Sequence, residues 1–174
     1  MMDQNFVQEF RGEIRTLEKK LEAFAQGDLS RKDYKGFSGG LGSYAQRDAS
    51  KNMLRLRCPG GRLTKEKLEF LAGIANEYKV DKIKLTTCQA MQFHDLSAAV
   101  LPVIMEKVID VGIYTKGGGG DNPRNVMCSP LSGVEQGEFA DCLPYAEAVT
   151  EYLLGIAGQI KMPRKLKVAF CGGA

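Results

Sequence analysis

The run GGGGDNPRNVMCSPLSG, residues 117–133, contains the residue types in this chain best suited to binding an anion. Its four consecutive glycines lack a β-carbon, so the backbone can approach a ligand closely and adopt positive φ values. Arg124 and Asn125 follow within a few residues and place a guanidinium beside an amide at the rim of an open turn. Such a pair suits an oxyanion or a carboxylate. A plain glycine-rich surface loop is the alternative interpretation.

Cationic side chains recur on one face of several predicted strands. In MLRLRC, residues 53–58, alternation places Arg55 and Arg57 on the face opposite the leucines. KIKLTTCQ, residues 82–89, and KLKVAF, residues 165–170, alternate in the same way, with lysines on one face. These patterns predict a sheet with one face open to a ligand and rich in positive charge.

An N-terminal helical arm is predicted ahead of these strands. Apolar residues recur at steps of three and four over residues 3–25, and Gly27 ends the helix. The arm is expected to lie across the domain or across a partner subunit. The polar, glycine-rich segment 28–42 is expected to be a loop.

The remaining helices alternate with the strands. Thr64 is the expected cap of a helix that buries Leu68, Leu71, Ala75 and Tyr78. A second helix, beginning at Ser97 or Leu101, runs through Val108 and is expected to bury Leu101, Ile104, Met105 and Val108. Residues 113–116 form a short strand. Pro144 begins a third, with Val149, Tyr152, Leu153 and Ile156 on its apolar side. This order predicts an α+β, ferredoxin-like (split βαβ) antiparallel sheet covered by helices on one face.

Composition limits the classes of protein to consider. The 174 residues suit one buried domain with an appended arm, and 44% hydrophobic with 26% charged residues is ordinary for a globular chain. No apolar run approaches the ~20 residues that cross a membrane, and the charged N-terminus lacks a signal-peptide core, so a cytoplasmic location is expected. The dispersed net charge of +3 argues against nucleic acid.

The five cysteines form no CxxC pair, so reduced thiols and no metal ligands are predicted within this chain. A nucleotide phosphate loop is disfavoured, because the glycine run lacks a following GK[ST].

Five motifs together resemble the siroheme-dependent sulfite and nitrite reductases. They are GSYAQR (42–47), MLRLRCPGG (53–61), KLTTCQAMQFH (84–94), GDNPRNVMCSPLSG (120–133) and MPRKLK (162–167). The resemblance implies the first of two repeats in those enzymes. It divides the chain into the arm at 1–27, a ferredoxin-like half-domain at 28–116, and the truncated start of a siroheme and [4Fe-4S] domain at 117–174.

By this resemblance the chain is the N-terminal part of an enzyme that catalyses the six-electron reduction of sulfite to sulfide. Lys167 favours sulfite, because nitrite-reducing relatives tend to have asparagine there; nitrite reduction to ammonia is the alternative. The implied cofactors are siroheme and a [4Fe-4S] cluster. The implied partners are the anion, an electron-donor protein or subunit, and the C-terminal half of the enzyme, without nucleic acid or membrane.

The resemblance also implies roles for individual residues. The catalytic cations around the substrate anion are Arg55, Arg124, Lys165 and Lys167. The cofactor-binding and pocket residues are Arg57, Lys84, Thr86, Gln92, Asn125 and Arg164. Fixed cations suit a small oxyanion beside a carboxylate-rich macrocycle, and a lysine desolvated among other cations can donate a proton.

Three points depart from the family pattern or leave alternatives open. Cys88 stands where relatives commonly have an arginine toward the cofactor. No two of the cysteines have the C-x5-C or C-x3-C spacing of the cluster ligands, so the cluster ligands are expected outside this chain and the chain alone is expected to be inactive. A non-catalytic siroheme-binding or anion-binding module remains the alternative, and His94 is a pocket or structural histidine rather than an axial ligand.

Overall fold

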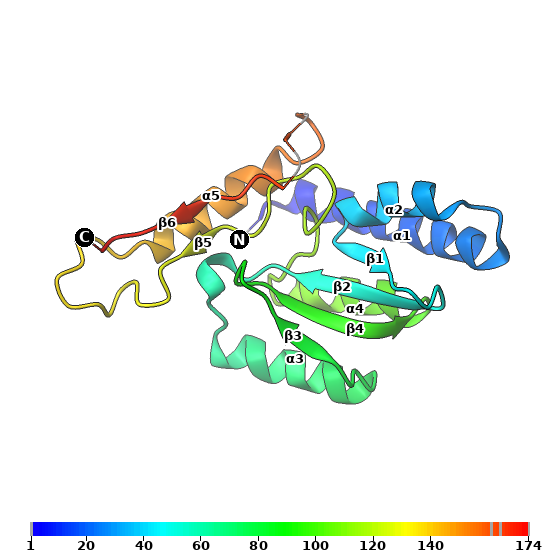
Figure 1. Cartoon of the computed structure of the whole chain (residues 1–174), viewed down its shortest axis with the longest axis horizontal. Helices are drawn as coiled ribbons and strands as arrows, with labels where there is room; N and C mark the ends of the chain where they lie inside the picture. Colours follow the sequence, from blue (N-terminus) through cyan, green and yellow to red (C-terminus); the bar gives the residue numbers. More distant parts are fainter. Residues whose placement is uncertain (1, 161, 164, 174) are drawn as a thin grey trace.

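A four-stranded antiparallel sheet forms the centre of the computed structural model, which describes residues 2–160, 162–163 and 165–173. The strands lie in the order β1, β2, β4, β3, and their bounds are Ser43–Ala45 for β1, Lys51–Leu56 for β2, Ile83–Leu85 for β3 and Met91–Ser97 for β4. Helix α3 (Lys65–Glu77) follows β2, and α4 (Val100–Asp110) follows β4 and lies behind the sheet in Figure 1. The predicted α+β, ferredoxin-like fold is confirmed.

The N-terminal helix α1 (Gln4–Gln26) packs on its own chain, against α4 and α2. Its apolar side, with Phe10, Ile14 and Leu17, is almost completely buried in the main core. The side chain of Asp3 caps its first turn, and Gly27 ends it in the left-handed conformation at φ 86°. Of the two predicted positions for the arm, the structure shows the one across the domain.

The loop predicted over residues 28–42 is wrong, because α2 occupies Arg31–Gly40. Ser30 caps this helix by accepting from the amide of Asp33. Tyr34 is fully buried, its ring stacks on Phe24 at 4.5 Å, and its hydroxyl donates to Asn52 at 2.9 Å. Packing of one aromatic side chain thus overrides a polar, glycine-rich composition.

The segment 82–89 does not form one long strand. Only Ile83–Leu85 pairs with β4, and a turn closed by Thr86 and Ala90 separates the two. A bulge interrupts the pairing of β2 with β4. Asn52 is opposite Leu96, and the next pair in the register is Leu54 with Phe93. Asp95, at φ 60°, lies in this bulge.

Several predicted boundaries and faces also differ. Residues 113–116 form no strand, and one backbone bond, from Arg57 N to the carbonyl of Tyr114, joins them to the end of β2. Thr64 caps α3 as predicted, but Leu68 is 52% exposed and Ile74 is buried instead. In α4 the predicted buried residues are buried, and Pro102 is accommodated in the first turn.

The C-terminal part has its own small core, around Val126 and Ala146. Helix α5 (Leu143–Gly155) covers a parallel pair of strands, β5 (Met127–Cys128) and β6 (Ala169–Phe170). The strand predicted over 165–170 is therefore limited to its last two residues, and Tyr152, predicted to be buried, is 67% exposed.

The short 3-10 turn η1 (Pro59–Gly61) joins the two parts, since a β-carbon on Gly60 would lie 2.6 Å from Leu143 Cδ1. Within the described part of the chain, no helix has both the length and the apolar character needed to cross a membrane.

Candidate anion-binding site

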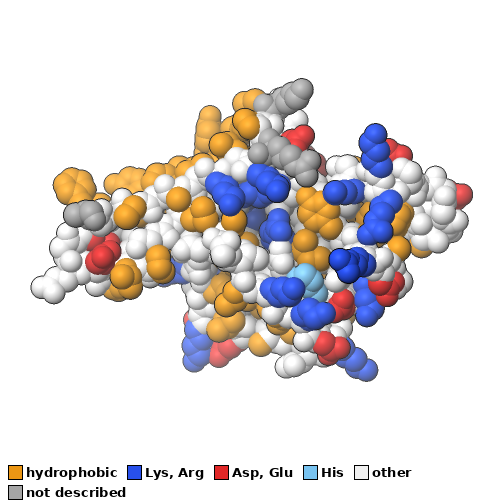
Figure 2. All heavy atoms as spheres, viewed as in Figure 1, with side chains coloured by type: hydrophobic (Ala, Val, Ile, Leu, Met, Phe, Trp, Pro, Cys, Tyr) orange, Lys and Arg blue, Asp and Glu red, His pale blue; other side chains and the backbone are white. Residues whose placement is uncertain are grey.

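A hollow of about 440 Å³ lies where α2, the sheet and the two chain segments around 124 and 165 meet. Its lining residues are Arg31, Tyr34, Lys35, Tyr44, Ala45, Arg55, Arg124 and Lys165. They include five cations and no carboxylate. Figure 2 shows Lys and Arg side chains gathered over this face of the sheet and α2. The hollow is therefore a region of positive potential suited to an anionic ligand.

The glycine run packs closely on its own chain, against residues of the α2 and β1 region. Gly117 and Gly120 have positive φ, at 73° and 63°. A β-carbon on Gly119 would lie 2.0 Å from Tyr44 Oη, and one on Gly118 would lie 3.0 Å from the Cα of Gly42. The glycines thus permit close approach of the loop to α2 and β1, and their carbonyls become available to the arginines.

Arg55, on β2, is held in place by two partners. Its Nη1 donates to the carbonyl of Gly118. The amide of Gln92 satisfies both of its neighbours when its oxygen accepts from Arg55 Nε at 3.0 Å and Nη2 at 2.6 Å, and its nitrogen donates to His94 Nε2 at 3.1 Å. Because Gln92 pairs with Arg55 in the sheet register, this chain of contacts fixes the guanidinium at the hollow.

Arg124 is the most buried cation of the hollow, with 9% of its surface exposed. Its Nη2 donates to the carbonyl of Gly120 at 3.0 Å and its Nη1 to that of Asn122 at 3.3 Å. The carbonyls of Gly120 and Asn122 therefore orient the guanidinium of Arg124.

Arg57 lies beneath the loop rather than in the hollow. Its Nη1 donates to the carbonyl of Pro123 at 2.9 Å and its Nη2 to that of Arg124 at 2.7 Å. Burial, and then the charge of Arg124, lowers the pKa of Arg57 to about 10, which still leaves it charged at neutral pH. Its side chain borders a separate cavity of about 390 Å³. A cofactor contact by Arg57 stays a prediction, whereas its role in holding the loop is shown.

Asn125 also ties backbone segments together. Its Oδ1 accepts from the amide of Cys58 at 3.0 Å, and its Nδ2 donates to the carbonyl of Cys58 at 2.7 Å. The same Nδ2 lies 3.0 Å from the carbonyls of Cys88 and Gln89. The neighbours Arg124 and Asn125 therefore have different surroundings. Arg124 lines the hollow, whereas Asn125 is 2% exposed and bonds to backbone groups.

The other predicted residues differ in whether they line the hollow. Lys84 is opposite Gln92 on the edge strand, and Thr86 Oγ1 accepts from the amide of Ala90 at 3.2 Å. Lys165, at φ 60°, lines the hollow, but Lys167 is exposed and is not among its lining residues. Arg164 lies outside the described residues. The structure thus brings together three of the four predicted catalytic cations.

Sequence reasoning missed the contribution of α2. Arg31, Lys35 and Tyr34 line the hollow although their segment was expected to be a loop. A signal was available, because a serine followed three residues later by an acidic residue is a helix N-terminal pattern.

The fold is that of a ferredoxin-like half-domain, and cations from separate segments of the chain converge on its hollow. Residues 44–111 match the family model described as the nitrite/sulfite reductase ferredoxin-like half domain, and residues 119–174 match the nitrite and sulphite reductase 4Fe-4S domain. The chain belongs to the nitrite and sulfite reductase family, whose cofactors are siroheme and a [4Fe-4S] cluster.

Named relatives include both kinds of reductase. A "Sulfite reductase [ferredoxin]" of Mycobacterium tuberculosis is 33% identical over 120 residues, which cover 69% of this chain and 22% of that protein. The chloroplastic "Ferredoxin--nitrite reductase" of Zea mays is 31% identical over 125 residues, with the same two shares. The structure of the Mycobacterium tuberculosis NirA protein matches with a TM-score of 0.72 at 25% identity, over 92% of this chain and 35% of that one. The chain thus spans about a fifth of the length of these curated relatives.

Proposed function

We propose that this chain is the part of a siroheme-dependent and [4Fe-4S]-dependent reductase that binds the substrate oxyanion and the carboxylates of siroheme, with sulfite as the substrate. One observation carries the proposal: Arg55, Arg124 and Lys165, which are far apart in the sequence, line one hollow, and none of its described lining residues is acidic. A surface loop that happened to be glycine-rich would give no reason for such convergence.

The residues present fit a carboxylate-rich macrocycle. Arg55 and Arg124 each have part of the guanidinium satisfied by carbonyls of the glycine run, which holds the group in one orientation. Such fixed donors bind carboxylates in a defined geometry and at a lower entropic cost than mobile ones. When bound, siroheme supplies the iron centre at which the oxyanion is reduced.

The chain's own residues have separable tasks in this proposal. Arg55 and Arg124 fix the charge of the oxyanion, and their effect is greatest where water is excluded. Lys165, which lines the hollow, is proposed to donate a proton during the reduction. Lys167 is proposed to join this set, and Arg164 is proposed to bind the cofactor. Lys84, Thr86, Gln92, Asn125 and Arg57 are proposed to support the cofactor pocket, in part by holding the residues that line it.

Relatives named as sulfite reductase and as nitrite reductase both match the chain, so the comparisons do not separate the two substrates. The choice of sulfite therefore rests on Lys167. The relatives named as ferredoxin-dependent suggest a ferredoxin as electron donor. The cluster ligands are proposed to come from the C-terminal half of the enzyme, and the chain alone is proposed to be inactive. The domain division at residues 27 and 116 belongs to the same proposal.

The test is a steady-state assay of the enzyme that contains this chain, with reduced methyl viologen as electron source. We expect siroheme absorbance, turnover of sulfite with a higher kcat/KM than nitrite, and a loss of about 100-fold in kcat/KM for Arg124→Gln. Lys32→Gln, on the exposed part of α2, is the matched control and should behave as the parent. A higher kcat/KM for nitrite than for sulfite would make nitrite the substrate. Siroheme absorbance without turnover of either anion would favour the non-catalytic binding module.

A further inference from the structure

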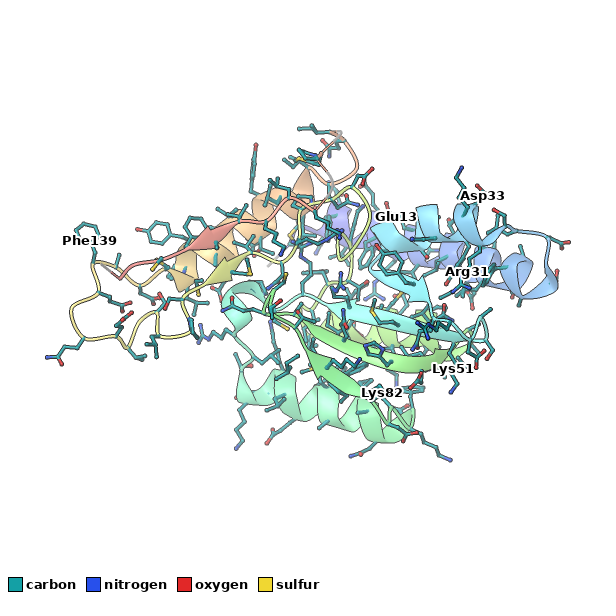
Figure 3. All side chains as sticks on the ribbon, viewed as in Figure 1. Glu13, Arg31, Asp33, Lys51, Lys82 and Phe139 are labelled. Carbon is teal, nitrogen blue, oxygen red and sulfur yellow. The ribbon has the colours of Figure 1, made fainter. Side chains whose placement is uncertain are left out.

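Two cations of α2 line the hollow beside the predicted site residues. Arg31 and Lys35 are four residues apart, so they project from the same face of the helix. Arg31 also donates to the carbonyl of Gln46, and Figure 3 shows it on the side of α2 that faces the β1–β2 hairpin. The match to the ferredoxin-like half-domain begins at residue 44, after α2, so it assigns neither residue a role.

Helix α2 is a fixed support for these cations. Tyr34, between them in the sequence, is fully buried and bonds to Asn52 of β2 at 2.9 Å. At the other end of the helix, the carbonyl of Gly40 accepts from the amide of Gly117 at 2.7 Å. Because α2 is tied to both the sheet and the glycine run, Arg31 and Lys35 keep their place relative to Arg55 and Arg124.

The cations lie at two depths. Arg124 is 9% exposed and Arg55 is partly buried, whereas Arg31, Lys35 and Lys165 are exposed at the rim. An oxyanion of three or four atoms held at the floor fills only a small part of about 440 Å³. Such an ion would leave the rim cations of α2 close together without a counter-charge among the lining residues. A ligand with several carboxylates would neutralise both levels at once.

We propose that Arg31 and Lys35 bind carboxylates at one edge of a polycarboxylate tetrapyrrole, which is siroheme if the proposed function holds. In this proposal Arg31 and Lys35 bind the cofactor at the rim, and Arg55 and Arg124 bind the oxyanion deeper in the hollow. The inference rests on the proposed function for the identity of the tetrapyrrole. It adds α2 to the binding site and predicts that this helix contributes to cofactor affinity.

The test is an absorbance titration of the full chain with siroheme at several salt concentrations. The double variant Arg31→Gln/Lys35→Gln should bind about tenfold more weakly at low salt and show a shallower salt dependence, because two screened ion pairs are lost. Lys32→Gln, on the same helix but outside the hollow, should match the parent. The charge-preserving Arg31→Lys/Lys35→Arg variant should recover most of the affinity, and circular dichroism should show all variants folded.

The possible outcomes separate this inference from the proposed function. If the α2 double variant binds siroheme as tightly as the parent chain, the inference is wrong and the proposed function stands. A loss of sulfite affinity without a loss of siroheme affinity would also overturn the inference, since the rim would then serve the oxyanion. Failure of the parent chain to bind siroheme would overturn both.

Discussion

The hydroxyl of Tyr44 occupies the space that a side chain on Gly119 would need, with Oη 2.0 Å from the ideal position of that β-carbon. The same hydroxyl accepts from the amide of Gly120 at 2.8 Å. Tyr44 thus fixes the height of the glycine run above β1. The neighbouring carbonyls of Gly118 and Gly120 in turn orient Arg55 and Arg124. The glycine run acts on the site through its carbonyls, not as a surface that a ligand touches.

Gly119→Ala should therefore destabilise the chain by about 2 kcal/mol, because the loop or Tyr44 must move to relieve the overlap. Sulfite affinity should fall in parallel as the two carbonyls leave the arginines. Chemical denaturation and calorimetric titration measure the two effects. Gly73→Ala in α3 is the control, since nothing lies within 4 Å of its β-carbon position, and it should stabilise slightly. Equal stabilities for the two variants would show that the loop does not need this close contact.

An ion pair connects α1 to the beginning of the glycine run. Lys116 Nζ lies 2.8 Å from Glu13 Oε1, with the lysine side chain 11% exposed, and 5.5 Å from the ring centre of Phe6. Glu13→Gln should lower the free energy of unfolding by roughly 2 kcal/mol, because a nearly buried ammonium loses its charged partner. Glu69→Gln, in the exposed pair with Lys65 at 3.8 Å, is the control and should change little. If both variants behave alike in urea denaturation, α1 does not brace the loop.

Arg57 provides a third way to test how the loop is held. Arg57→Met should destabilise the chain by about 3 kcal/mol, because the buried carbonyls of Pro123 and Arg124 lose their donors. Unfolding is measured without siroheme, so any cofactor contact has no influence on the result. Arg62→Met is the matched control, since Arg62 is half exposed and its distance to Glu147 is 3.9 Å. If Arg57→Met loses no more unfolding free energy than Arg62→Met, the contacts of Arg57 do not stabilise the loop, and only the proposed role in cofactor binding is left.

The sequence predicted elements best where pattern and packing agreed. The apolar periodicity of α1 and α4 identified the buried faces because the helix period alone decides which side chains meet the core. The order of strands and helices likewise indicated the ferredoxin-like sheet. Convergence of Arg55, Arg124 and Lys165 followed only from the family resemblance, since no local pattern brings such distant segments together.

Other features depended on tertiary contacts that a local pattern cannot reveal. Helix α2 exists because Tyr34 has a buried place beside Phe24. The backbone contacts of Arg57 and Asn125 were not predicted for a related reason: their side chains are polar and suited to ligands, and a local pattern does not reveal that they satisfy buried backbone groups. At Asp95, a bulge breaks the alternation on which face assignments rest.

The single histidine of the chain, His94, reports on the charge around the site. Burial first, and then Lys84 with Lys82 and Arg55, lowers the pKa of His94, while Asp95 opposes them. Acceptance of a hydrogen bond from Gln92 at 3.1 Å agrees with a neutral ring. The imidazole proton shifts in NMR spectra should therefore titrate below the ordinary value of about 6.5.

The sign of the linked stability change follows from this lowered pKa. Between the two pKa values the unfolded chain binds more protons at His94 than the folded chain, so stability falls as pH drops through about 6.5 and the loss is complete below the folded pKa. His94→Gln should remove this component of the acid loss. Saturating sulfite, bound near Arg55, should raise the His94 pKa because it offsets the cationic charge. A pKa at or above the ordinary value, or one that sulfite leaves unchanged, would show that His94 and the hollow are not electrostatically connected.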